Sequence, residues 1–438
     1  MNVRKLGLVI LFLAFLLSVG QSPQSVSAAA TNYYIDSVNG SDGNSGTSSN
    51  KPWKSLANVS DRNFQPGDIV NFKRGSTWVG EMSIRASGLQ GKPITFQDYG
   101  TGAAPVISNP GQGNRAIRIY SSWVVVQGFL LKDTGEAALE IVAGGNHNVI
   151  QNIEVTNAGM GVSIGGQFNL VTNNYAHDLK MVVNTPGGDD DYGAFGFLIL
   201  NSDNEVSFNR CVNCRATSYD YGYDGGVIEI YGNGDNAYIH NNYGQNSNGF
   251  MEVGGAVARN VRVAYNISDN NYADFICLHI GGTFGSTIDN FRIENNTIVN
   301  TAVGGWQVID CAYATLSASQ FIFRNNIVYS NMNVSSQSTF THTDNIYYMT
   351  GGATVGFPLG SGEQVSNPLF VNVSGGNYRL QSASPAINSG VYLGYVIDYE
   401  QNSVPQGGSP DIGAFEYARA TSGGSSGTAR LYLPFVIR

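Results

Sequence analysis

The chain has 438 residues, of which only 13 % are charged, and its 55 glycines are typical of a turn-rich β protein rather than a helical one. Its formal net charge of −9 excludes an electrostatic attraction to nucleic acid or to an anionic membrane surface. The length fits one large elongated domain or two ordinary ones.

The first residues have the features of a bacterial secretory signal peptide, which we place at residues 1–28. Arg4 and Lys5 precede an apolar stretch at residues 6–19, and small residues surround Ala28. The apolar stretch is shorter than the roughly 20 residues that a membrane-spanning helix needs. We therefore expect a protein without a membrane span that is secreted or held at the cell surface.

The next segment, residues 31–120, contains three polar, glycine-rich phrases. They read YYIDSVNGSDGNSG from Tyr33, FQPGDIVNFKRGSTW from Phe64 and GKPITFQDYG from Gly91. What these phrases imply about the fold follows from a resemblance that they share with the end of the chain.

Between Asn146 and Asn326 one phrase recurs: Asn, an alternating apolar run, a second Asn and another apolar run. The period lies between about twenty and the mid thirties with no helical pattern, which predicts a solenoid of β coils. Stacked coils place equivalent residues about 4.8 Å apart, so that the recurring Asn amides are expected to bond along the stack. The second Asn falls at Asn152, Asn174, Asn209, Asn242, Asn266, Asn296 and Asn326.

Two long insertions, residues 184–196 and 215–226, interrupt the repeat and predict long loops on one face, where solenoids commonly bind ligands. Aromatic rings in and near them are candidate platforms for sugar rings, the alternative being ordinary loop packing. Acidic residues beside them are candidates for binding sugar hydroxyls or Ca²⁺. The proposed sugar-binding residues are Tyr219, Tyr221, Tyr223, Trp306, Asp220 and Asp224, and the possible Ca²⁺ ligands, alternatively a solvated acidic turn, are Asp189, Asp190 and Asp191.

The four cysteines of an exported chain allow disulfides. Cys211 and Cys214 are close enough in sequence to pair locally. Cys277 and Cys311 fall on neighbouring coils, but strand alternation directs them to opposite faces, so we expect no bond between them. The spacing of cysteine and histidine does not predict a zinc site.

The last part of the chain, residues 346–417, contains SPAINSG from Ser384 and PDIGAFEY from Pro410. A Gly/Ser-rich linker at residues 418–430 and a short apolar tail at residues 431–438 follow.

Together, the three phrases of the first segment and the two of the last resemble secreted right-handed parallel β-helix proteins. These share the pectin-lyase-like fold and include polysaccharide lyases and glycoside hydrolases. The resemblance covers about Tyr33 to Tyr417 and implies an all-β, right-handed parallel β-helix at residues 31–417. In this fold, residues 31–120 form the cap and first coils, residues 121–345 the central coils with the candidate active site, and residues 346–417 the last coils and closing segment.

The strands that open the central coils can be aligned so that one outward position forms a row. Apolar residues flank its last four members and must face inward. Neighbouring carboxylates in such a row repel one another, so one keeps its proton while the other is ionised, as glycosidic hydrolysis requires. The alternative is a row of polar residues that simply faces water. The row reads Glu140, Ser163, Leu198, Glu229, Glu252, His279 and Asp310, with the last four as catalytic candidates.

We therefore expect a secreted glycoside hydrolase that acts on a plant or microbial polysaccharide as a monomer, with no required cofactor and with Ca²⁺ as an option. A polysaccharide lyase and a non-catalytic glycan-binding surface protein remain alternatives. Lyases of this fold commonly use Lys or Arg as the base, whereas the row contains neither and the last lysine is Lys180. The spacing of Glu229 and Glu252 fits retention of configuration, and that of Glu252 and Asp310 fits inversion. The acids and aromatics favour neutral glycans.

Overall fold

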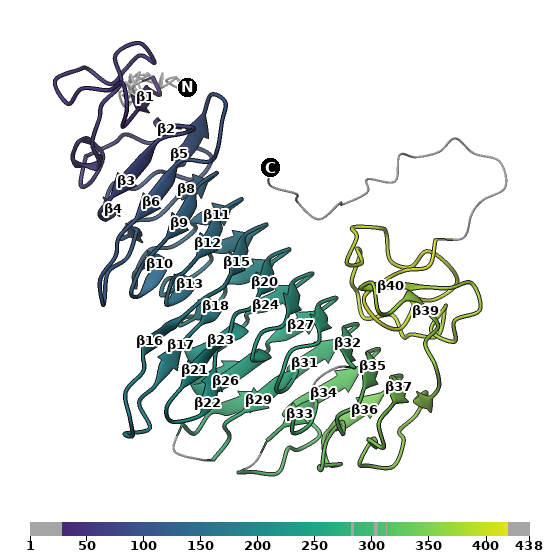
Figure 1. Cartoon of the computed structure of the whole chain (residues 1–438). Coiled ribbons are helices and arrows are strands. Elements are labelled where there is room, and N and C mark those ends of the chain that lie inside the picture. The colour runs from purple at the N-terminus through teal and green to yellow at the C-terminus, as the bar shows by residue number, and fades with distance from the viewer. Residues whose placement is uncertain (1–28, 282–283, 302–304, 312, 419–438) are drawn as a thin grey trace, which may run out of the picture.

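The computed structural model describes residues 29–281, 284–301, 305–311 and 313–418 (Figure 1). The predicted signal peptide, the apolar tail and all but the first residue of the predicted linker lie outside these ranges. No helix within the described ranges is long and apolar enough to cross a membrane.

The chain winds into successive coils, and three long parallel sheets run along the stack (Figure 1). Sheet 1 contains β1 (Asn32–Ile35), β2 (Ile69–Lys73), β5 (Ile94–Tyr99), β8 (Val124–Gln127), β11 (Val149–Gln151), β14 (Leu170–Thr172), β19 (Glu205–Ser207), β24 (Tyr238–His240), β27 (Arg262–Ala264), β31 (Phe291–Glu294), β34 (Phe321–Arg324) and β36 (Thr341–Thr343).

Sheet 2 carries the predicted row of acidic residues. Its strands are β4 (Met82–Ile84), β7 (Ile117–Ile119), β10 (Ala137–Ile141), β13 (Met160–Ile164), β18 (Phe195–Ile199), β23 (Gly226–Asn233), β26 (Gly249–Arg259), β29 (Ile276–Leu278) and β33 (Ile309–Asp310), with β30 (Thr287–Asp289) paired beside β26.

Sheet 3 completes each coil. Its strands are β3 (Thr77–Val79), β6 (Val106–Ser108), β9 (Leu130–Lys132), β12 (Glu154–Thr156), β15 (Tyr175–His177), β20 (Arg210–Val212), β25 (Tyr243–Gln245), β28 (Ile267–Asp269), β32 (Thr297–Asn300), β35 (Ile327–Ser330), β37 (Ile346–Met349) and β38 (Gln364–Val365).

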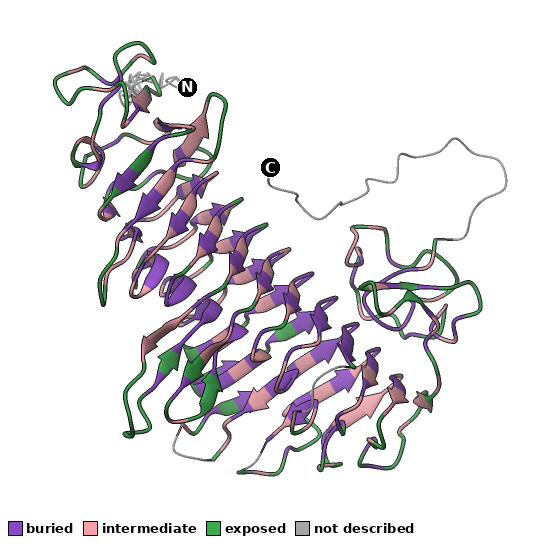
Figure 2. Cartoon of the chain, in the orientation of Figure 1, coloured by how far each residue is buried: buried purple, intermediate pink, exposed green. Residues whose placement is uncertain are grey.

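Apolar side chains fill the space between the three sheets. Buried and less buried positions alternate along many of the strands (Figure 2). In β23, for example, Ile228 and Ile230 are buried while Glu229 between them is half-buried. The helix η1 (Leu56–Asn58) is a single short turn, and it is the only helix in the described ranges. The predicted right-handed parallel β-helix is confirmed.

A ladder of buried Asn side chains runs along the corner between sheets 1 and 3. Each member donates from Nδ2 to Oδ1 of the next over 3.0–3.1 Å, and that Oδ1 also accepts the backbone N–H of the donating residue. The predicted Asn ladder is therefore confirmed. Its members are Asn174, Asn209, Asn242, Asn266, Asn296, Asn326 and Asn345.

Asn152, which the repeat placed in this ladder, lies one residue before it. Its φ of 53° lies in the left-handed region, as does that of Asn173, the corner residue of the next coil. Ile153 occupies the ladder position, and its backbone N–H donates to Oδ1 of Asn174 over 3.1 Å. The doublet of Asn residues in later coils explains the one-residue error, because the corner and the ladder both favour Asn.

Three antiparallel hairpins stand outside the sheets. Two of them, rich in exposed residues, occupy the predicted long insertions beside sheet 2 (Figure 2). The third belongs to the closing segment, the part of residues 346–417 that follows β38. This segment folds back along sheet 3 (Figure 1). The hairpins pair β16 (Met181–Val183) with β17 (Tyr192–Gly193), β21 (Ala216–Ser218) with β22 (Gly222–Asp224), and β39 (Phe370–Asn372) with β40 (Asn377–Leu380).

The cysteines behave as expected. Cys211 and Cys214 form a disulfide at the start of the second insertion. Cys277 is free and half-buried on the outer face of sheet 2, and Cys311 is free and buried.

Candidate active site on the outer face of sheet 2

Strand pairing fixes the outward row of sheet 2 and corrects one of its members. Glu252 of β26 is in register with Cys277 of β29, and Cys277 is in register with Asp310 of β33. His279 lies two residues after Cys277, directly beyond the end of β29, and is not in this register. We call Glu229, Glu252, Cys277 and Asp310 the acid row.

Glu229 and Glu252 are direct neighbours in parallel strands, with Ile228 paired to Met251 and Ile230 paired to Val253. These four apolar partners are buried, so both carboxylates must face outward. Neighbouring strands lie about 4.8 Å apart, and like charges at that separation repel. Leu198, the preceding member of the row, offers no compensating charge.

The carboxyl of Glu229 lies in enclosed surroundings. Burial raises its pKa well above the ordinary value, and the charges of Glu252 and Asp224 raise it further. Part of the side chain still reaches the surface. Its surroundings therefore favour the protonated form of Glu229 more than water would, which suits the acid of a general acid–base pair.

Asp224, at the end of β22, belongs to the same charged group. Burial raises its pKa to about 7, and Glu252 and Asp191 contribute through their negative charges. The hairpin β21–β22 thus brings a third carboxyl toward Glu229 and Glu252 from the long insertion. The sugar-binding role that the sequence suggested for Asp224 stays a prediction, and its charge also belongs to the electrostatic surroundings of Glu229.

His279 contacts the acid row although it is not a member. Its Nε2 lies 2.9 Å from Oε1 of Glu252 and 3.5 Å from Sγ of Cys277. The hydrogen bond to Glu252 raises the pKa of the imidazole. His279, a catalytic candidate from the sequence, is therefore placed to orient the Glu252 carboxylate.

Asp274 is a member of this face that the sequence analysis missed. It precedes β29, and burial raises its pKa to about 8, with the charge of Asp310 as the next cause. Asp310 itself accepts a hydrogen bond of 2.9 Å from Nε2 of Gln307. The sequence did contain a clue to Asp274. It lies three residues before Cys277, and the equivalent position on the preceding coil, three residues before Glu252, is Gly249.

At the other end of the outward row of sheet 2, the carboxylate is compensated by positive charge. Glu140 forms ion pairs with Arg115 at 2.5 Å and with Arg118 at 2.8 Å. The acid row has no such partners, because no ion pair with Lys or Arg reaches its carboxylates in the described residues. The uncompensated charge is concentrated where the two insertions flank sheet 2.

The aromatic residues that the sequence singled out for sugar binding have exposed rings. Tyr219 is 67 % exposed and Trp306, just before β33, is 84 % exposed. Tyr221 and Tyr223 are also exposed, although the Arg215 guanidinium lies 3.5 Å from the Tyr223 ring centre and covers part of that ring. Their role in binding sugar stays a prediction.

The predicted Ca²⁺ ligands are part of a hydrogen-bonded junction between the two insertions. Asp191 accepts the Ser218 hydroxyl at 2.7 Å and three backbone N–H groups, and Asp189 accepts the Tyr221 hydroxyl at 2.8 Å. Oxygen atoms of Asp190, Asp191 and Asp220 lie within 4.8 Å of one another. A bound Ca²⁺ at these residues stays a prediction, with Asp220 in place of Asp189.

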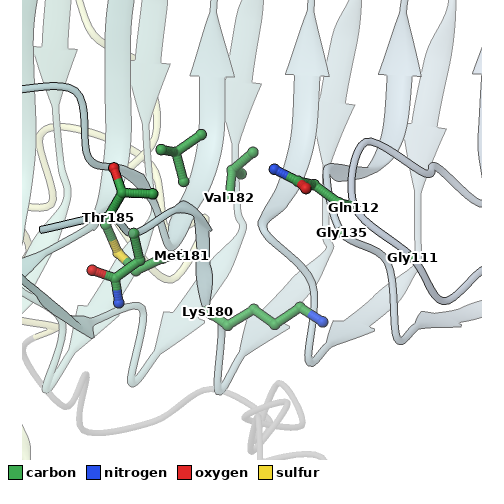
Figure 3. Close-up of a pocket in the computed structure, with 9 residues that line it drawn as sticks. Gly111, Gln112, Gly135, Lys180, Met181, Val182 and Thr185 are labelled. Atoms are coloured by element: carbon green, nitrogen blue, oxygen red, sulfur yellow. The ribbon is translucent and has the colours of Figure 1, made fainter.

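A cavity of about 500 Å³ lies beside β16, away from the acid row (Figure 3). It is lined by Gly111, Gln112, Gly135 and residues 180–185, and Figure 3 shows Gln112 pointing toward Val182. The lining contains no acid and no histidine, and Lys180 is its one ionisable side chain. The acid row therefore lies outside this cavity, on the open face of sheet 2.

Comparison with solved structures agrees with the fold. Pectate lyase Pel9A superposes with a TM-score of 0.63 at 18 % identity, over 89 % of this chain and 98 % of that one. XylC in complex with xylose superposes with a TM-score of 0.52 at 10 % identity, over 88 % of this chain and 98 % of that one. At such low identity the likeness concerns the fold alone.

Sequence comparison finds shorter matches, and no protein-family model matches the chain. Lacto-N-biosidase from Bifidobacterium longum subsp. longum is 31 % identical over 153 residues, which are 32 % of this chain and 9 % of that protein. The uncharacterized protein YwoF of Bacillus subtilis is 30 % identical over 118 residues, 26 % of this chain. The chain thus spans 9 % and 25 % of the lengths of these two relatives.

Proposed function

We propose that the protein is a secreted glycoside hydrolase whose catalytic pair is Glu229 and Glu252. The observation that carries the proposal is the direct register of these two residues on the outer face of sheet 2, with a raised pKa at Glu229. The partial sequence match to a lacto-N-biosidase and the folds of a pectate lyase and of XylC support action on a glycan.

In this mechanism Glu229 donates its proton to the glycosidic oxygen as the bond to the leaving sugar breaks. Glu252, oriented by Nε2 of His279, attacks the anomeric carbon or activates the water that does so. Glu229 gives one proton to the leaving group. It regains one from the water that hydrolyses the intermediate.

The spacing of the pair favours retention of configuration. Neighbouring strands lie about 4.8 Å apart, close to the roughly 5 Å between the carboxyl groups of retaining enzymes. Asp310 lies two strands from Glu252, which corresponds to the longer spacing of inverting enzymes, so pairing Glu252 with Asp310 is the alternative. Proton NMR of the first product formed distinguishes them, because the initial anomer keeps the configuration of the substrate only in the retaining case.

The test is incubation with neutral polysaccharides, uronic polysaccharides and an oligosaccharide containing lacto-N-biose, with reducing ends and ultraviolet absorbance both followed. New reducing ends without the absorbance of an unsaturated uronate are expected. Glu229→Gln and Glu252→Gln should each lower turnover at least about 100-fold, since acid–base groups contribute about that much or more.

Glu205→Gln is the matched control. Glu205 also pairs with a histidine, His240 at 3.1 Å, but on sheet 1. This variant should keep full turnover. Equal turnover in the wild type and in both sheet 2 variants would remove the acid row from consideration, and a rise in absorbance would mean a lyase.

A further inference from the structure

The end of the acid row gathers three side chains whose ligand atoms come from separate positions of two coils. Asp274 precedes β29, Cys277 lies in β29 and Asp310 lies in β33. A carboxylate oxygen of each Asp and the Cys277 sulfur lie within 4.8 Å of one another. Their convergence follows from the coil register, because Cys277 and Asp310 are direct strand partners.

One atom of this cluster is unsatisfied. Among the described residues, Oδ1 of Asp274 is buried without a hydrogen-bond partner, and the residue is only 8 % exposed. A buried polar atom without a partner is unfavourable in a folded protein, and a buried carboxylate more so. The atom belongs to the ligand group itself, so that a cation bound there would satisfy it.

The local charge points the same way. Asp274 and Asp310 have no ion pair with Lys or Arg among the described residues, and Glu252 adds a third carboxylate one strand away. The nearby His279 is already bonded to Glu252. A divalent cation would offset the repulsion that this arrangement creates.

We propose that Asp274, Cys277 and Asp310 bind one divalent transition-metal ion of the Zn²⁺ class. The donor set decides the class, because Ca²⁺ and Mg²⁺ select oxygen ligands, whereas a thiolate with carboxylates and a nearby imidazole suits Zn²⁺ or Co²⁺. Three protein ligands leave at least one coordination position for water. On binding, the thiol releases its proton to solvent as the sulfur–metal bond forms.

The ion would lie next to the proposed catalytic pair without being one of its members. Glu252 is the strand partner of Cys277, and His279 links the two through contacts of 2.9 and 3.5 Å. Glu252 and His279 thus become the outer contacts of the metal site, which orient the ligands in the way that carboxylate–histidine pairs do in other zinc sites.

The experiment is a titration of the reduced, chelator-treated, full-length mature protein with Co²⁺ in the absence of oxygen. We expect one Co²⁺ per chain and a near-ultraviolet thiolate-to-cobalt charge-transfer band that Zn²⁺ abolishes by competition and excess Ca²⁺ does not. Cys277→Ser should remove the band. Asp274→Asn should raise the dissociation constant at least about tenfold, since even outer contacts of metal sites are worth that much.

Cys311→Ser is the matched control, because Cys311 is the other free cysteine in the described chain and is buried on the inner side. It should keep the band and the affinity. Far-ultraviolet circular dichroism of each variant checks that the fold is intact. The proposal would be overturned if the wild type showed no band, if the band persisted in Cys277→Ser, or if Ca²⁺ displaced the Co²⁺. These outcomes do not depend on whether the protein cleaves glycans.

Discussion

Glu229 and Asp224 share one electrostatic environment, in which the ionisation of either opposes that of the other. The pKa of Glu229 is raised by burial and then by the charges of Glu252 and Asp224, and that of Asp224 is raised to about 7 by burial and then by Glu252. The pH at which the proposed acid loses its proton therefore depends on how many of its neighbours are charged.

This coupling makes the pH profile a test of the proposed acid. A general acid works while it is protonated, so activity should fall as the pH rises through the pKa of Glu229. Asp224→Asn removes one negative charge, which lowers that pKa and shifts the alkaline limb of kcat to lower pH. A pH–rate profile of the variant measures the shift. The same limb in both proteins would mean that Glu229 is not the titrating acid.

The same residue predicts a pH dependence of stability. The pKa of Asp224 is higher in the folded state than the unfolded value near 3.9, so the folded chain binds more protons and its stability declines as the pH rises from about 4 to about 7. Asp224→Asn should therefore raise the free energy of unfolding at pH 8 by on the order of a few kcal/mol relative to wild type. Thermal unfolding at pH 4 and pH 8 checks this, and an equal effect at both values would contradict it.

Single residues also show where sequence patterns are ambiguous. Side chains of a strand alternate with period two, so Cys277 and His279 satisfy the same outward rule. Only the hydrogen bonds between strands choose between registers that differ by two residues, which is why the sequence placed His279 in the row. Glu229, Glu252 and Asp310 were aligned correctly because apolar residues flank each of them in a single register.

At the scale of elements, the Asn ladder is the feature that the sequence predicted best. Each buried Asn bonds to two coils, as Asn242 does with the backbone N–H of Asn209, the carbonyl of Val206 and the amide of Asn266. These bonds satisfy corner groups that water cannot reach. The periodic Asn in the sequence records this requirement directly.

Removing one member should be costly. Asn242→Ala leaves buried donors and acceptors of the neighbouring coils unpaired, at about 1–3 kcal/mol for each such group. Urea unfolding should show a loss of at least that size. Asn63→Ala, at an exposed loop position whose side chain forms no hydrogen bond with a described residue, should stay within about 0.5 kcal/mol. Similar losses in both variants would deny the ladder a special role.

The closing segment is the element that the sequence described least. It contains no repeat, so nothing in its pattern reveals that it lies against the outside of sheet 3. There it covers the outward residues Ile267, Val299, Ile327 and Ile346. Alternation alone would have assigned these apolar side chains to solvent.

On the scale of the whole molecule, this cover predicts opposite outcomes for two outward apolar residues of sheet 3. Ile327 in β35 is 1 % exposed under the closing segment, whereas Val79 in β3, outside that cover, is 72 % exposed. Ile327→Ala should lower the free energy of unfolding by about 2–5 kcal/mol, as for a core residue. Val79→Ala should change it by less than about 0.5 kcal/mol. Chemical denaturation of both variants provides the measurement.

A stack of coils in which each coil contacts only its neighbours has no intrinsic reason to unfold all at once. The closing segment alters this for the later coils, because it is hydrogen-bonded to several of them. Its bonds join Asn241 to Asp398, Asp269 to Tyr378, Asn295 to Asp411 and Asn325 to Val391. The closing segment joins these coils along one side of the stack, so that we expect them to unfold together. We expect the coils nearer the N-terminus to unfold one at a time.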